Sequence, residues 1–167
     1  MIAGAAAIGC AFALAGCGGN ESEPAAAAAP RQEGPGLFYT SLIREKATGQ
    51  YELAWQSLHP FHQQFAPRKT YLQCENLTAF PGRLLDVSVV RVTAEPVQIA
   101  GEDHTVPAKA VTVKVSVDYP GISKPVVVTD TYHAISVNGR WRWILTRANF
   151  AEYKAGRCPG AAPPPKA

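Results

Sequence analysis

A run of alternating valines in the second half of the chain restricts the possible fold more than any other sequence feature. Between residues 111 and 117 every second residue is valine, and Thr112, Lys114 and Ser116 stand between them. Because successive side chains of a β-strand point to opposite faces, this pattern puts every valine on one face and the polar residues on the other. The segment is therefore predicted to be a strand with one buried face.

Further β-like segments lie on both sides of this strand. A Val-rich run covers residues 84–100, and a turn at residues 120–123 leads into another such run at 124–137. The Asn-Gly pair at 138–139 is a strong signal for a tight hairpin, and it joins that run to residues 140–147. The sequence therefore predicts four long antiparallel strands.

The residues before the strands have apolar side chains at helical spacing. Helical patterns cover residues 37–49 and 50–58, and the second ends at His59 because a residue before proline avoids helical backbone. Pro60 and Pro67 are each suited to the start of another short helix.

A last short helix is expected over residues 149–156, with Asn149 as its N-cap and Gly156 just after its end. Helices followed by antiparallel strands define an α+β fold, in which the N-terminal helices pack on the sheet.

Residues 49–60 read GQYELAWQSLHP and residues 138–145 read NGRWRWIL. Together with the paired long strands, these two segments resemble the nuclear-transport-factor-2-like family, also called the cystatin-like cone. The resemblance implies a cone-shaped α+β domain, with N-terminal helices packed on a bent antiparallel sheet of four or more strands and a pocket open at one end. A small cystatin-like or lipocalin-like sheet without the cone is the alternative.

An apolar run near the N-terminus, at residues 2–15, is shorter than the roughly 20 residues that span a bilayer, and Leu-Ala-Gly stands directly before Cys17. These residues resemble the bacterial lipoprotein signal. The resemblance implies that the Cys17 thiol receives a diacylglycerol, that the signal is cut before it, and that the acyl chains anchor the protein. No Lys or Arg precedes Arg31, so we expect the true start to lie upstream. The alternative is an ordinary secretory signal cut nearby, which leaves the cysteine free.

The chain is thus expected to consist of a signal peptide (1–16), a lipidated cysteine with a flexible tether (17–36), the folded domain (37–160) and a disordered tail (161–167). The implied location is the cell envelope, with the domain on the extracytoplasmic side of the membrane. Because Gly18 rather than aspartate follows the cysteine, the resemblance implies the outer membrane if the cell has two.

Two cysteines remain within the expected domain. Since exported chains enter an oxidising compartment, Cys74 and Cys158 are expected to pair as a disulfide. The bridge would close a loop of roughly 85 residues, which the chain-entropy model values at about 4–5 kcal/mol. A redox or metal pair is disfavoured because the two cysteines do not form a C-x-x-C motif.

Two sets of residues are candidates for lining a pocket. Asp130 and Tyr132 are two apart on a predicted strand and therefore share a face. An apolar pocket could be lined by Trp55, Trp141 and Trp143 together with Tyr39, Tyr51 and Phe61. The alternatives are a solvated strand face or a core hydroxyl with a partner for the first pair, and plain core for the aromatic residues.

No metal, cofactor or nucleic acid is expected. His59 and His62 have the spacing of metal ligands, but no third ligand follows, and we expect two polar residues at a helix break. The net charge is only +3 and the basic residues are scattered, whereas nucleic-acid-binding proteins concentrate them on one face.

The expected function is that of a membrane-anchored, non-enzymatic binding or accessory domain for a small apolar ligand or an envelope protein. One alternative is an isomerase- or dehydratase-like enzyme that uses the cone pocket, for which the sequence shows no catalytic motif. Another is a structural envelope protein that binds through an exposed apolar patch on the sheet.

Replacing Cys17 by Ser removes the thiol that the lipid would modify, so this variant should leave the membrane fraction and lose labelling by a fatty acid. Cys10→Ser is the matched control, because that residue lies in the expected signal and should not matter. Membrane association of the Cys17→Ser protein without lipid labelling would contradict the anchor.

Overall fold

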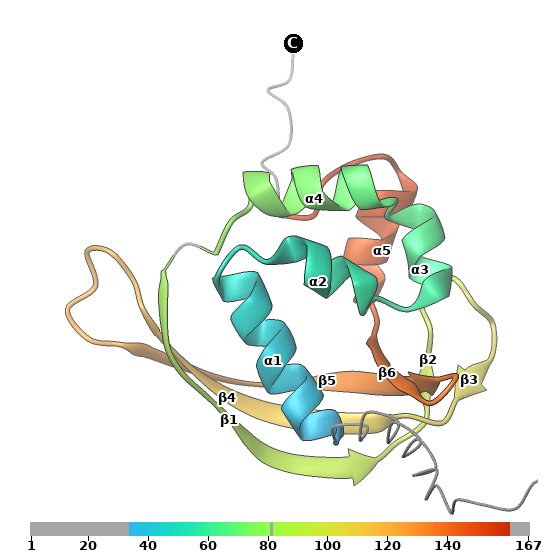
Figure 1. Ribbon diagram of the computed structural model, residues 1–167, viewed down its shortest axis with the longest axis horizontal. Helices are drawn as coiled ribbons and strands as arrows, with labels where there is room; N and C mark the ends of the chain where they lie inside the picture. The colour runs from blue at the N-terminus through green and yellow to red at the C-terminus, as the bar shows by residue number, and fades with distance from the viewer. Residues whose placement is uncertain (1–33, 81, 161–167) are drawn as a thin grey trace, which may run out of the picture. The chain divides into compact units, whose positions relative to one another are not determined.

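Four short helices precede the sheet in a computed structural model that describes residues 34–80 and 82–160 (Figure 1). Cys17, the expected signal and tail, and most of the expected tether lie outside the described residues. A proline in the first turn begins the first and third helices, and Pro67 is the N-cap of the fourth, because its fixed φ suits a helix start. The helices are α1 (Pro35–Ala47), α2 (Tyr51–Gln56), α3 (Pro60–Phe65) and α4 (Arg68–Leu77).

A four-stranded antiparallel sheet and a fifth helix follow. The strand order in the sheet is β1-β4-β5-β6, and β2 pairs with β3 in a separate two-stranded sheet. The helices pack on one face of the bent sheet (Figure 1), which confirms the predicted α+β class. The elements are β1 (Arg83–Ala94), β2 (Val97–Gln98), β3 (Thr105–Val106), β4 (Lys109–Asp118), β5 (Val126–Val137), β6 (Arg140–Trp143) and α5 (Arg147–Lys154).

The alternating valines form the inner face of β4, as predicted. Val111 and Val113 are fully buried, whereas the hydroxyl of Thr112 on the other face lies 2.9 Å from that of Thr131. Two register shifts in β1 are β-bulges, which bend a strand. The Asn-Gly pair makes the β5–β6 hairpin, and both of its residues have positive φ (50° and 74°), as a type I′ turn requires.

Trp143 joins the helices to the last strand of the sheet. Its backbone N–H donates to Ser57 O (3.1 Å) and its carbonyl accepts from His59 N (2.8 Å). Its indole Nε1–H donates to Ala54 O at 2.7 Å. The segment after α2 therefore extends the sheet at β6, and Trp143 is fixed by three hydrogen bonds to this segment and to α2.

His62 is buried in the core, whereas the sequence suggested a polar residue at a helix break. Because the Leu145 N–H donates to Nδ1 (3.0 Å), the ring proton must be on Nε2, which lies 3.0 Å from Ala100 O. His62 is fully buried and His59 is half-buried. Among the described residues, no cluster of three or more His, Cys, Asp or Glu could hold a metal ion.

The last helix begins earlier than predicted. Thr146, not Asn149, is its N-cap, and the Thr146 hydroxyl accepts from Asn149 N at 3.1 Å. Both residue types favour this position, and the cap is set by where the extended backbone after β6 turns into the helix. Gly156 follows the helix with a φ of +72°, as predicted for its end.

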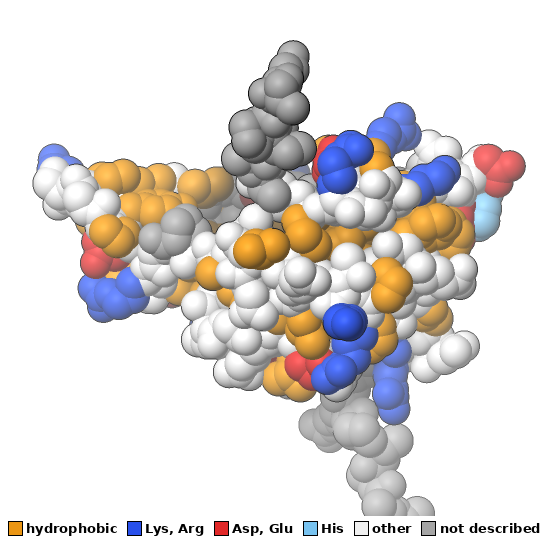
Figure 2. Space-filling model, turned by 90° about the horizontal axis from the view of Figure 1, so that it is seen from above, with side chains coloured by type: hydrophobic (Ala, Val, Ile, Leu, Met, Phe, Trp, Pro, Cys, Tyr) orange, Lys and Arg blue, Asp and Glu red, His pale blue; other side chains and the backbone are white. Residues whose placement is uncertain are grey.

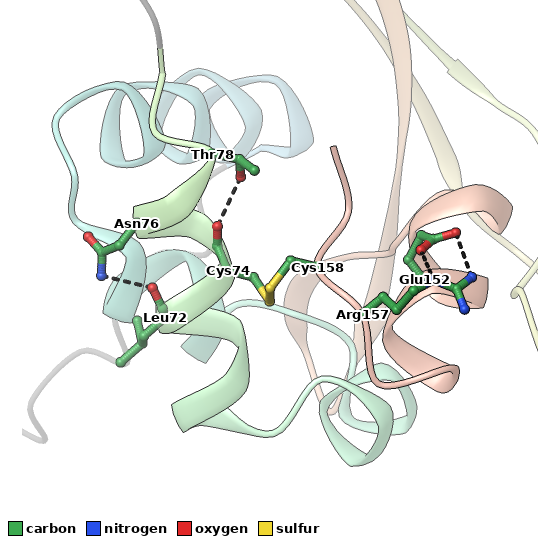
Figure 3. The surroundings of a disulfide bond; sticks show 7 residues. All are labelled: Leu72, Cys74, Asn76, Thr78, Glu152, Arg157 and Cys158. Atoms are coloured by element: carbon green, nitrogen blue, oxygen red, sulfur yellow. Dashed lines mark hydrogen bonds and ion pairs between the residues drawn. A yellow bond between two sulfur atoms is a disulfide. The ribbon is translucent and has the colours of Figure 1, made fainter. Parts of the chain in front are cut away.

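A disulfide links α4 to the segment after α5 (Figure 3). The sulfurs of Cys74 and Cys158 are bonded, and the two residues are 84 apart in the sequence. In the same region Arg157 forms an ion pair with Glu152 at 2.7 Å, which closes the turn after α5. The helical layer is therefore covalently tied to the C-terminal segment.

Replacing both Cys74 and Cys158 by Ala should lower the free energy of unfolding by about 2–5 kcal/mol, because the unfolded chain regains conformational freedom. Urea denaturation of this variant and of the native protein measures the difference. Native protein treated with a reductant is the matched control and should match the variant. Equal stability of oxidised native protein and variant would contradict a bridge that stabilises the fold.

Stability should fall in mild acid because of His62. Burial lowers the pKa of this imidazole, so the unfolded chain binds a proton at a higher pH than the folded one. Neutral His62 makes its full contribution to the stability of the fold above the ordinary histidine pKa of about 6.5. This contribution is lost as the pH falls below that value toward the lower folded-state pKa. The melting temperature measured from pH 8 to pH 5 tests this expectation.

The variant His62→Gln keeps a donor and an acceptor but cannot titrate, so its melting temperature should depend less on pH. The residual dependence comes partly from His59, whose pKa is also lowered by burial. His104→Gln is the control, because the His104 side chain is 63% exposed. A pH dependence that is the same in His62→Gln and in the native protein would disprove the assignment.

Candidate functional site

A cavity of about 340 Å³ lies between α1 and the inner face of the sheet. This volume is within the range of about 300–1,000 Å³ that is usual for small-molecule sites. Most of its lining side chains are apolar, and they come from α1, β4, β5 and the end of β6. The apolar lining residues include Leu42, Ile43, Val115, Val117, Val128 and Trp143.

The cavity continues toward the β4–β5 hairpin, which projects at the left of Figure 1. Figure 2 shows hydrophobic side chains gathered on this hairpin. Val128 belongs both to the lining of the cavity and to the exposed hydrophobic residues of the hairpin, and it is 48% exposed. Its neighbour Val127 is 52% exposed, and because the side chains of a strand alternate it points to the opposite face.

A second hollow of about 330 Å³ adjoins the first and has more polar walls. Glu75, Tyr51 and Tyr153 line this second hollow. The two hollows share wall residues, so an apolar compartment and a polar compartment meet at one place. The shared residues are Lys46, Phe80, Trp143 and Asn149.

Lys46 stands at this junction in an ion pair. Its Nζ lies 3.0 Å from Glu75 Oε1, and it is 5.1 Å from the centroid of the Trp143 ring and 5.9 Å from that of Tyr71. The ammonium is therefore neutralised by one carboxylate and is also attracted by aromatic faces. This contact connects the end of α1 to α4.

Tyr39 holds the other end of α1 against the sheet. Its hydroxyl donates to the carbonyl of His133 at 2.6 Å, and its ring stacks on Tyr132 with centroids 5.4 Å apart. Burial, and secondarily the neighbouring Tyr132, raise the pKa of Tyr39 far above its ordinary value. Tyr39 is thus a neutral, fixed wall of the cavity.

Asp130 and Tyr132 both line the cavity, opposite Val113 and Val111 on β4. Burial, and then the nearby Asp130 carboxylate, raise the pKa of Tyr132 to about 12. Asp130 itself is exposed, and its Oδ1 accepts from Thr131 N at 2.8 Å. The pair offers a hydroxyl that keeps its proton at neutral pH and a carboxylate with spare acceptor sites.

The cavity brings together four of the candidate pocket residues: Tyr39, Asp130, Tyr132 and Trp143. Trp55 is absent from the lining of both hollows, and its Nε1–H donates to Ala66 O at 2.9 Å. Trp141 is half-buried against the core and is also absent from these linings. Of the three tryptophans, only Trp143 lines the same cavity as Asp130 and Tyr132.

Sequence reasoning missed Lys46 and Glu75 as site residues. They are 29 residues apart on different helices, so no local pattern connects them. Tyr39 is among the aromatic candidates named from the sequence, but its helical spacing does not distinguish it from an ordinary core residue. Only the packing of α1 across the sheet and beside α4 reveals their roles.

No known protein-family model matches the sequence, and a search of curated proteins found no relative. Within the described part of the chain, none of the helices combines the length and the apolar character that crossing a membrane requires. The chemistry of the cavity is therefore inferred from its own residues. They can surround an apolar group, accept hydrogen bonds at Asp130 and donate one from Tyr132.

Proposed function

We propose that this chain is an envelope lipoprotein, anchored through Cys17, whose nuclear-transport-factor-2-like domain binds a small apolar ligand. The lipoprotein-like signal supports the anchor, and the bent sheet under N-terminal helices supports the family. The observation that carries the binding function is the apolar cavity between α1 and the sheet.

A binding role fits the site better than an acid–base reaction does. An efficient proton-transfer group has a pKa near the working pH, whereas Tyr132 has a pKa of about 12. Asp130 is exposed to solvent rather than held in the dry pocket that tunes a catalytic acid. His133 is on the opposite face of β5, where its Nε2 lies 3.3 Å from Glu95 Oε1.

An isomerase- or dehydratase-like enzyme is the second candidate. The observation that favours it is the placement of a carboxylate beside a tyrosine on one wall of an apolar cavity. In such an enzyme Asp130 would accept a proton from carbon and Tyr132 would donate a hydrogen bond to the substrate oxygen.

Binding can be tested with the neutral fluorescent probe N-phenyl-1-naphthylamine, which brightens in apolar sites. The native domain should enhance its fluorescence saturably. Val128→Trp places a large side chain in the cavity and should weaken binding about tenfold or more, which corresponds to about 1.4 kcal/mol of lost contact.

Val127→Trp is the matched control, because it makes the same change one residue away, where the side chain points to the other face. This variant should bind the probe like the native protein. Absence of saturable binding to the native domain would contradict the proposed function. Equal effects of the two substitutions would show that the probe binds elsewhere.

A further inference from the structure

We infer that the ligand of this cavity is a small amphiphile with a protonated amine, whose ammonium group binds at Asp130 and whose apolar body lies under α1. The inference rests on the proposed binding function and adds the chemical class of the ligand.

The uncompensated charge in the cavity is negative. Lys46 also lines the cavity, but its ammonium is already paired with Glu75 at 3.0 Å. No ion pair within residues 34–80 and 82–160 involves Asp130. A cationic group would therefore find an unpaired carboxylate there, and an anionic group would meet repulsion.

The Asp130 carboxylate can accept further hydrogen bonds. An ionised carboxylate has about four lone-pair sites, and the backbone N–H of Thr131 occupies one of them at 2.8 Å. The Tyr132 hydroxyl, on the same face of β5, is a second hydrogen-bond partner of this carboxylate, and acceptor sites remain beyond these two. An ammonium with its N–H donors can therefore bond to this carboxylate without displacing the Thr131 contact, and such charge-assisted bonds are the strong ones.

Aromatic rings beside the carboxylate complete a site for a cation. Tyr132 lines the cavity next to Asp130 and is stacked on Tyr39, and both rings form walls of the same space. The negative face of an aromatic ring attracts a cation. A carboxylate together with such rings recognises an ammonium better than it recognises a neutral hydroxyl.

The remaining walls suit a short hydrocarbon body. Val115, Val117 and Val128 form the floor, and Leu42 and Ile43 cover it from α1. Burying each methylene group of a ligand adds to its affinity, so a short alkyl chain strengthens binding while the polar contacts orient the head group. A cavity of about 340 Å³ suits a molecule of this size rather than a long lipid.

Three probes with the same alkyl chain separate the charge of the head from the apolar body: octylammonium, octan-1-ol and octanoate. Titration calorimetry at pH 7 and low salt should show octylammonium binding about tenfold more tightly than octan-1-ol, with octanoate the weakest. High salt should reduce the advantage of the ammonium, because screening weakens charge pairs.

Asp130→Asn should remove this advantage, so that octylammonium and octan-1-ol bind equally. Asp118→Asn is the matched control, because Asp118 lies on the same sheet but is paired with Arg83 at 3.0 Å and does not line the cavity. It should leave all three affinities unchanged.

Equal binding of octylammonium and octan-1-ol to the native protein would overturn the inference and leave the proposed function intact. Tighter binding of octanoate, lost in Lys46→Met, would also overturn it by placing an anionic head at Lys46. Failure of octylammonium to bind a protein that binds the neutral naphthylamine probe would refute the inference alone. Failure of all these probes would refute the proposed function as well.

Discussion

The attachment of Trp143 to the segment after α2 is the contact on which the domain depends. Its backbone forms hydrogen bonds with Ser57 and His59, and its indole donates to Ala54. These bonds fix the height of the helices above the sheet at one edge. The same ring is a wall of both hollows and lies under the Lys46 ammonium. One side chain therefore sets the packing of the two layers and the dimensions of the cavity.

The helix above the cavity is fixed at both ends. Tyr39 bonds to the backbone of β5 near one end of α1, and Lys46 pairs with Glu75 of α4 near the other. Between these contacts Leu42 and Ile43 face the cavity. A half-buried ion pair contributes little to stability by itself, and its effect here is to fix position. The position of α1 over the cavity is thus set by contacts near both of its ends, and Leu42 between them belongs to the hydrophobic core.

The features predicted correctly are those that local chemistry determines. The alternating valines predict a half-buried strand. The Asn-Gly pair predicts a tight turn with positive φ, and the prolines predict where helices begin. The features missed depend on how the elements pack on one another. Thr146 and Asn149 are both good helix caps, and only the end of β6 decides between them. Burial of His62 is possible because its two ring nitrogens form hydrogen bonds with the backbone of Ala100 and Leu145. No local sequence pattern indicates these contacts.

The period of two along β4 separates the inside of the cavity from the outside of the protein. Residues that set the size of the cavity, such as Val115 and Val117, alternate with residues that meet water, such as Lys114 and Ser116. Substitutions at Val115 and Val117 therefore change what fits under α1 and leave the charge and polarity of the outer face of β4 as they are.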